Sequence, residues 1–199
     1  MRYFAPFVIA VTMLAAAFYL GAQEKGGRKG GKKGFTLPPM VHLTVDEFRD
    51  GGHIPAKYTC AAGQNSPSPA IGWTGAPANT QSFTLILHDP DPVLNGSATN
   101  DVLHWAIFDI PGNATSLPEG VKAGDQADGA KQIKNIAGNM AFLPPCPPAG
   151  HGDHHYTFEI YALNAKLDLP DTASRQELME AMNGKVIGKG LYIGLFGQK

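Results

Sequence analysis

The chain has 199 residues, 43% of them hydrophobic and 17% charged, which suffices for one well-filled core and is short for two substantial domains. Its 24 glycines and 16 prolines disfavour a helical bundle and favour short strands joined by tight loops, as in a β sandwich. The formal net charge of -1 argues against nucleic-acid binding, because duplex binding usually leaves a basic surface over much of a domain.

The first 22 residues have the pattern of a secretory signal peptide. Arg2 is followed by an apolar run over residues 8–18, and the small residues Gly21 and Ala22 end the segment. We therefore expect export to the periplasm or the extracellular space. An uncleaved membrane anchor is the alternative, although the apolar run is at the short end for crossing a bilayer.

Residues 23–34 alternate basic side chains with glycine and have nothing to pack into a core. Such a segment loses much backbone entropy on folding, so we predict a disordered basic linker, with a tether for anionic lipid as the alternative. The folded domain then spans residues 35–199.

Three segments predict central strands: Ser82–His88, Leu103–Asp109 and His155–Leu163. Each is short, rich in β-branched and aromatic residues, and bounded by Pro, Gly or Asn. A further apolar run, Leu191–Phe196, predicts a closing strand.

One segment, Ser174–Met182, predicts a helix. Ser174 and Glu177 have capping-box spacing, and Asn183-Gly184 is a stop signal. The predicted fold is thus mostly β with a few short helices.

The two cysteines, Cys60 and Cys146, leave two interpretations open. In an exported protein they could form a disulfide that closes a long loop. Two free, buried thiols are the alternative, because free cysteine is an ordinary core residue.

Polar residues gather in three places, each at the end of a predicted strand: residues 88–92 (HDPDP), His104, and residues 144–156 (PPCPPAGHGDHHY). Side chains at strand ends can converge at one mouth of a sandwich, where a rigid scaffold holds them. The prolines beside Asp89 and Asp91 would present both carboxylates in a stiff turn.

The chemistry that these residues favour is anion capture. His104 and His154 can each donate a ring N–H, and Asp89 could fix the tautomer of one imidazole. Tyr156 could add a hydroxyl donor to the charge-assisted hydrogen bonds that hold a phosphate. These residue types therefore predict a site for a small anionic ligand.

Two other chemistries are alternatives. A metal could use the histidines and aspartates of residues 88–91 and 151–155, but their spacing matches no zinc signature, and adjacent strand residues such as His154 and His155 point to opposite faces. We therefore expect neither metal nor cofactor. A hydrolase with an Asp/His site is the second alternative, although no G-x-S-x-G motif is present and neither cysteine has a catalytic setting.

A series of short motifs, in order along the chain, carries a family resemblance. They are Y-T-C (58–60), W-x-G-A-P (73–77), D-P-D-P (89–92), H-W (104–105), P-C-P-P (145–148) and H-x-Y-x-F-x-x-Y-A-L (154–163). From about Phe35 to about Phe196, the chain resembles the phosphatidylethanolamine-binding protein family, in its bacterial and archaeal branch often called Raf-kinase-inhibitor-like.

The resemblance implies a sandwich of a large and a small antiparallel sheet with Greek-key connections, and a small cavity for phosphate-like anions or phospholipid head groups. It implies a protein that acts by binding rather than catalysis, as modulators of kinases or inhibitors of proteases do in this family. The ligand-binding residues that it implies here are Asp89, Asp91, His104, Pro147, Pro148, His154 and Tyr156.

The chain departs from the family pattern at two places near this cavity. His155 stands where the family usually has arginine, so a permanent positive charge is replaced by a pH-dependent one. Leu143-Pro144 stand where glycines are expected and could narrow the entrance or remove backbone donors. These differences predict weaker anion binding, and an interaction module with a vestigial pocket is the alternative.

Overall fold

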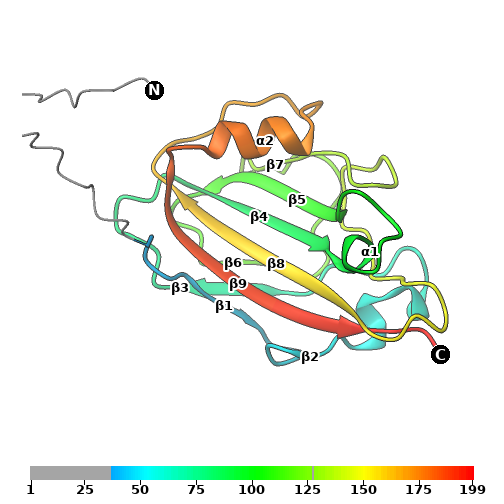
Figure 1. Cartoon of the computed structure of the whole chain (residues 1–199). Helices are drawn as coiled ribbons and strands as arrows, with labels where there is room; N and C mark the ends of the chain where they lie inside the picture. The colour runs from blue at the N-terminus through cyan, green and yellow to red at the C-terminus, as the bar shows by residue number, and fades with distance from the viewer. Residues whose placement is uncertain (1–36, 127) are drawn as a thin grey trace, which may run out of the picture. The chain divides into compact units, whose positions relative to one another are not determined.

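The computed structural model describes residues 37–126 and 128–199, which form two β-sheets with short helices at their margins (Figure 1). The predicted signal peptide or anchor (1–22) and linker (23–34) lie outside the described residues. Among the residues described, no helix is long and apolar enough to span a membrane.

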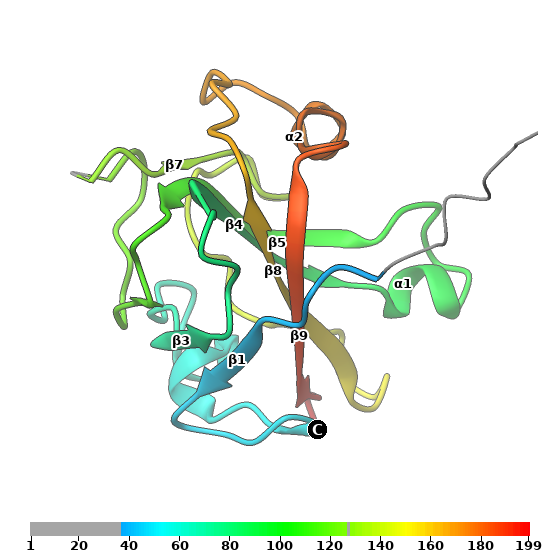
Figure 2. The same ribbon diagram turned by 90° about the vertical axis from the view of Figure 1, so that its left-hand side faces the viewer.

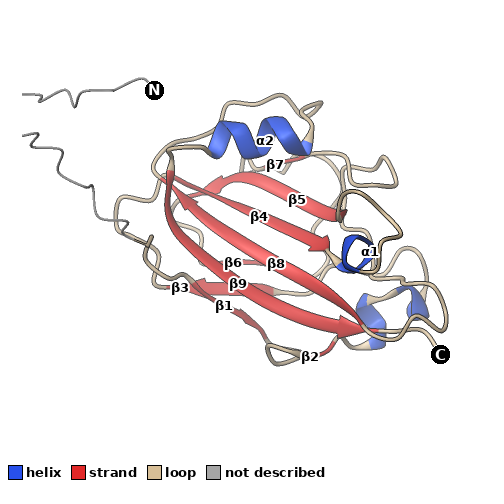
Figure 3. Ribbon diagram, viewed as in Figure 1, coloured by secondary structure: helices blue, strands red, loops and turns tan. Residues whose placement is uncertain are grey.

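The large sheet has six strands in the order β2-β9-β8-β4-β5-β7, and the small sheet has three in the order β1-β3-β6. The strands are β1 (His42–Val45), β2 (Gly52–His53), β3 (Ile71–Thr74), β4 (Ser82–Asp89), β5 (Val102–Pro111), β6 (Ser116–Leu117), β7 (Lys131–Gln132), β8 (His154–Leu163) and β9 (Val186–Phe196). The helices are α1 (Asp91–Leu94) and α2 (Arg175–Met182), with 3-10 turns at Ala56–Tyr58 and Cys60–Ala62. Strands therefore dominate, as predicted (Figure 3).

Within the large sheet, the order β8-β4-β5-β7 returns a late strand beside an early one, which is the Greek-key arrangement. One pairing differs from the predicted antiparallel sheets, because β2 runs parallel to β9, with Gly52 opposite Gly194. β2 reaches this edge from the small sheet and not through a hairpin, so the connection does not force an antiparallel direction.

Both faces of the large sheet are buried, because successive side chains of each strand point to opposite sides. On one face, Leu85, Trp105 and Phe158 pack against the small sheet in the main core. On the other, Ile86 and Phe108 pack in a second core that includes the side chains of α2. Figure 2 shows α2 and the small sheet on opposite sides of the large sheet. Two buried faces explain why the central strands are almost continuously apolar.

Helix α2 begins and ends as predicted. The Ser174 side chain accepts a hydrogen bond from the Glu177 backbone N–H, and Glu177 accepts one from the Ser174 N–H, which completes the capping box. Leu178 and Met182 are buried, and Gly184 adopts a φ of 74° just after the helix.

Candidate functional site

Three strand ends meet at one end of the large sheet, and they carry the predicted polar residues. β4 lies between β8 and β5 and is antiparallel to both, so the end of β4 adjoins the beginnings of the other two strands. Asp89 ends β4, His104 is near the start of β5, and His154 and Tyr156 begin β8.

A cavity of about 220 Å³ opens at this junction. Its wall contains six of the seven residues predicted to bind a ligand: Asp89, His104, Pro147, Pro148, His154 and Tyr156. The rest of the wall is mainly apolar and consists of Gln64, Pro92, Val102, Ile136, Leu143, Pro144 and Cys146. The sequence thus indicated most of the polar wall of one cavity.

Asp89 and His154 form a buried pair in this wall. Nδ1 of His154 lies 2.7 Å from Oδ2 of Asp89, and both side chains are 5% exposed. Oδ1 of Asp89 accepts the backbone N–H of Asp91 at 2.9 Å. Because a carboxylate only accepts, Nδ1 of His154 carries the hydrogen, and its other nitrogen, Nε2, has no hydrogen-bond partner among the described residues.

His104 is fixed by the main chain of Leu143. Its Nδ1 donates to the Leu143 carbonyl at 3.0 Å, and the Leu143 N–H donates back to the His104 carbonyl at 3.0 Å. The ring meets the Tyr156 ring edge to face, with centroids 5.2 Å apart. Burial lowers the pKa of His104, so the neutral ring is favoured.

Tyr156 is fully buried, and its hydroxyl has no hydrogen-bond acceptor among the described residues. Burial raises the pKa of Tyr156, the charges of Asp89 and Asp91 raise it further, and the Cys146 main chain opposes them only weakly. The hydroxyl therefore keeps its proton and is a donor without an acceptor in the wall of a cavity.

Asp91 lies beside the cavity and does not line it. Its carboxylate accepts the backbone N–H of His155 at 2.6 Å and contacts the His155 ring at 3.1 Å. Burial alone would raise the pKa of Asp91, but these bonds from His155 outweigh it and hold the pKa below its usual value. Asp91 thus ties the start of α1 to the start of β8.

The carboxylate oxygens of Asp89 and Asp91 and a ring nitrogen of His154 lie within 4.8 Å of one another, which is close enough for a metal ion. In the structure, however, these carboxylates already accept hydrogen bonds from His154 and from the His155 backbone. His154 is buried and His155 exposed, as expected for neighbours in a strand.

The proline wall is held by a disulfide. Cys60 and Cys146 are bonded, with Cα atoms 5.3 Å apart, which decides between the two interpretations of the cysteines. The Cys60 N–H donates to the Pro145 carbonyl at 3.0 Å, and the Gln198 side chain donates to the Pro147 carbonyl at 2.6 Å. The loop that carries Pro147 and Pro148 is therefore attached at several points.

Leu143 and Pro144, which stand where the family pattern has glycines, are both part of the cavity wall. Sequence reasoning missed the wall residues Gln64, Val102 and Ile136. Gln64 lies in a loop far from the strand motifs, and its only signal was its nearness to Cys60, whose partner was not decided.

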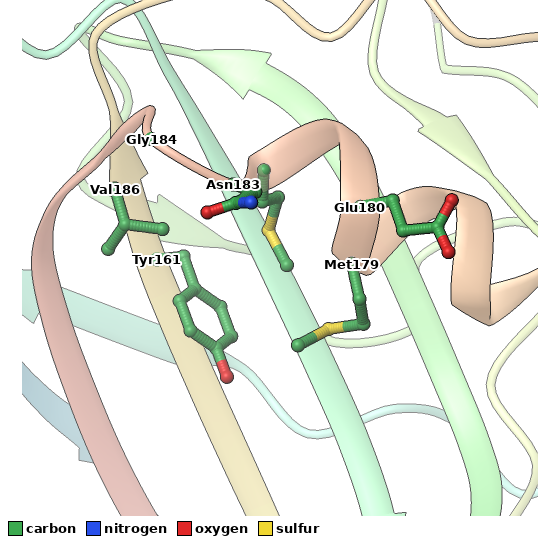
Figure 4. Close-up of a pocket in the computed structure, with 7 residues that line it drawn as sticks. Tyr161, Met179, Glu180, Asn183, Gly184 and Val186 are labelled. Atoms are coloured by element: carbon green, nitrogen blue, oxygen red, sulfur yellow. The ribbon is translucent and has the colours of Figure 1, made fainter.

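A second hollow, of about 440 Å³, lies against α2 and is shown in Figure 4. Met179, Met182 and Val186 contribute apolar side chains to it, and Tyr161 and Glu180 are its titratable residues. The Tyr161 hydroxyl is already hydrogen-bonded to Glu159 at 2.7 Å. No set of unpartnered polar groups converges there among the residues described, so the strand-end cavity is the stronger candidate.

Comparisons with known proteins agree with the fold and the motifs. The family model "Phosphatidylethanolamine-binding protein" matches residues 44–197. The chain is 41% identical over 157 residues to a "UPF0098 protein" of Methanothermobacter thermautotrophicus, covering 78% of this chain and 98% of that one. It is 31% identical over 162 residues to "Putative lipoprotein LppC" of Mycobacterium tuberculosis, covering 80% and 74%.

A solved structure is similar as well. The homologue CT736 of Chlamydia trachomatis superimposes with a TM-score of 0.70 at 30% identity, covering 80% of this chain and 99% of that one. The chain therefore belongs to the phosphatidylethanolamine-binding protein family.

Proposed function

We propose that this chain is an exported, non-enzymatic binding protein whose strand-end cavity takes a small anion with the chemistry of phosphate. The observation that carries the proposal is the buried Tyr156 hydroxyl, which has no acceptor of its own and shares the cavity wall with two imidazoles. A buried donor without an acceptor costs free energy unless a ligand or water satisfies it.

The size and charge of the cavity favour a small anion. At about 220 Å³ it is below the volume typical of sites for drug-sized ligands, roughly 300–1,000 Å³. The Asp89 carboxylate is already hydrogen-bonded to the His154 ring at 2.7 Å, so its charge is not left without a partner in the wall. Tyr156 supplies a hydrogen-bond donor.

The state of the candidate nucleophiles supports binding over hydrolysis. Cys146 is held in a disulfide, so it offers no thiolate. Burial raises the pKa of Tyr156, which suppresses its phenolate. The Asp89 carboxylate already accepts hydrogen bonds from His154 and from the Asp91 N–H, and a water nucleophile would have to be activated beside a wall that is mainly apolar.

Export is proposed on three grounds. Residues 1–22 have the signal-peptide pattern, a disulfide is typical of oxidising compartments, and one relative is named a lipoprotein.

An NMR titration tests the proposal. With millimolar phosphate or phosphorylethanolamine, we expect the imidazole signals of His104 and His154 to shift, while those of the exposed His42 on β1 stay in place. His104→Ala should weaken binding at least about tenfold. The proposal is wrong if the signals of His104 and His154 do not move, and turnover of a generic ester that is lost in His104→Ala would indicate an enzyme instead.

A further inference from the structure

We propose that the cavity selects an oxyanion that still carries a proton, such as hydrogen phosphate or a singly ionised phosphomonoester, because His104 presents a hydrogen-bond acceptor to it. Sulfate and phosphodiesters, which have no such proton, are discriminated against. This inference rests on the proposed anion site and specifies its ligand.

The tautomer of His104 follows from geometry. A backbone carbonyl can only accept, so the 3.0 Å contact with the Leu143 oxygen requires the hydrogen on Nδ1. In a neutral ring, Nε2 then carries a lone pair. This nitrogen has no partner among the described residues, and the ring is part of the cavity wall.

Burial favours a neutral ring for His104, and the groups that face the ring act in both directions. The hydrogen bond to the Leu143 carbonyl and the charge of Asp89 on β4 favour the charged form. His88 on β4 and His154 on β8 oppose it, and Tyr156 contributes an uncharged hydroxyl. The Asp89 charge is already paired with His154 at 2.7 Å. Burial is the largest influence and lowers the pKa of His104, so near neutral pH the ring accepts rather than donates.

The wall therefore offers one acceptor and at least one donor to the same ligand. A hydrogen phosphate can donate its P–OH to Nε2 of His104 and accept from the Tyr156 hydroxyl through an ionised oxygen. No proton is transferred in this arrangement. A fully ionised oxyanion would place an oxygen lone pair against the nitrogen lone pair and leave His104 unsatisfied, which we expect to weaken binding at least about tenfold.

The proposed preference for a protonated oxyanion distinguishes free phosphate, phosphomonoesters and phosphodiesters as ligands. Near neutral pH, inorganic phosphate keeps one proton, whereas a phosphomonoester loses its last proton near pH 6, at about the second pKa of a phosphorylated side chain. A phosphodiester, as in an intact phospholipid head group, has no proton at any physiological pH. Free phosphate, or a monoester in mildly acidic surroundings, is thus favoured over a lipid.

Isothermal titration calorimetry of the purified protein tests the inference with four probes: phosphate, sulfate, phosphorylethanolamine and glycerophosphorylethanolamine, at pH 5.5 and 7.5. At pH 7.5, phosphate should bind at least about tenfold more tightly than sulfate or the diester. Phosphorylethanolamine should lose more affinity than phosphate between the two pH values, because only the monoester loses its last proton there.

Two variants connect the discrimination to His104. His104→Gln places an amide donor in the wall and should bring the phosphate-to-sulfate affinity ratio close to one. His42→Gln makes the same change on β1, away from the cavity, and should leave the ratio unaltered. Nitrogen-15 spectra of the unmodified protein give a measurement free of variants: Nε2 of His104 should stay unprotonated when phosphate is bound.

The titrations distinguish failure of the proposed selection from failure of the anion site. Equal affinities for phosphate and sulfate at pH 7.5, or a protonated Nε2 in the phosphate complex, overturn the selection rule and leave the anion site standing. No binding of any probe at millimolar concentration overturns the anion site itself.

Discussion

Asp89, the last residue of β4, forms a buried hydrogen bond with His154 of β8. Its carboxylate holds Nδ1–H of His154, and neither side chain is more than 5% exposed. Asp89→Asn keeps the shape but removes the carboxylate that accepts the Nδ1–H of His154 and holds its ring in place. We expect phosphate affinity to fall at least about tenfold, and the free energy of unfolding to fall by about 1.5–3 kcal/mol, as for a hydrogen bond to a charged group.

Calorimetry and urea unfolding measure these two effects. Asp46→Asn, the same change at an exposed aspartate next to β1, is the matched control and should behave as the unmodified protein. Unchanged phosphate affinity in Asp89→Asn would show that the carboxylate does not act through His154.

At the scale of residues, motif reasoning located Asp89, His104 and His154 as wall residues of one cavity because their side chains are polar and titratable. For Leu143 it considered a narrowed entrance or a lost backbone donor, whereas the structure shows that its main-chain carbonyl fixes the tautomer of His104. Backbone carbonyls are common to all residues, so residue types alone could not reveal this partner.

At the scale of elements, α2 is attached to the large sheet by an ion pair as well as by its apolar side. Arg175 forms two hydrogen bonds to Asp101, one of them at 2.9 Å. Burial alone would raise the pKa of Asp101, but the guanidinium of Arg175 outweighs burial and holds the pKa below its usual value.

The sign of the resulting pH dependence follows from this lowered pKa. A carboxyl group whose pKa is lower in the folded state stabilises the protein above its unfolded pKa of about 3.9, and this stabilisation is lost as the pH falls through the folded pKa. Asp101→Asn should therefore reduce the free energy of unfolding at pH 7, and this difference should shrink as the pH falls below about 3.9 toward the folded pKa of Asp101. Urea unfolding of both proteins at pH 7 and at a series of lower pH values measures this, and a difference that stays constant over the series would contradict the role of the pair.

Elements with a strong local sequence pattern were predicted at the right positions. Short strands that are defined mainly by pairing with a neighbouring strand were not. β4, β5, β8 and α2 were found within one or two residues. The family resemblance implied the small sheet, but its strands and the two-residue strands β2 and β7 were not located, because strands of two to four residues show little periodicity.

β9 was predicted only from Leu191, although it begins at Val186, because glycines interrupt its apolar pattern. At two of these positions, tertiary contacts require a glycine. A Cβ at Gly190 would collide with the Val41 carbonyl, and one at Gly194 would lie 2.5 Å from Cγ1 of Ile54.

At the scale of the whole molecule, the disulfide joins segments that are 86 residues apart. On the chain-entropy model, a closed loop of this length stabilises the fold by about 4–5 kcal/mol. Cys60→Ser/Cys146→Ser should lower the free energy of unfolding by this order, as should reduction of the unmodified protein by a dithiol. Urea unfolding measures both effects, and a reductant that also destabilised the double variant would show that it acts elsewhere.

The cavity is assembled from residues that are distant along the chain. Asp89 and His154 are 65 positions apart, and His154 reaches Asp89 and His104 only when β8 has docked beside β4. Such long-range pairing is slow compared with local structure formation. If the cavity binds phosphate as proposed, recovery of phosphate binding during refolding should report completion of the central sheet, and a chain that ends before β8 should lack the site, even where its hairpin of β4 and β5 has formed.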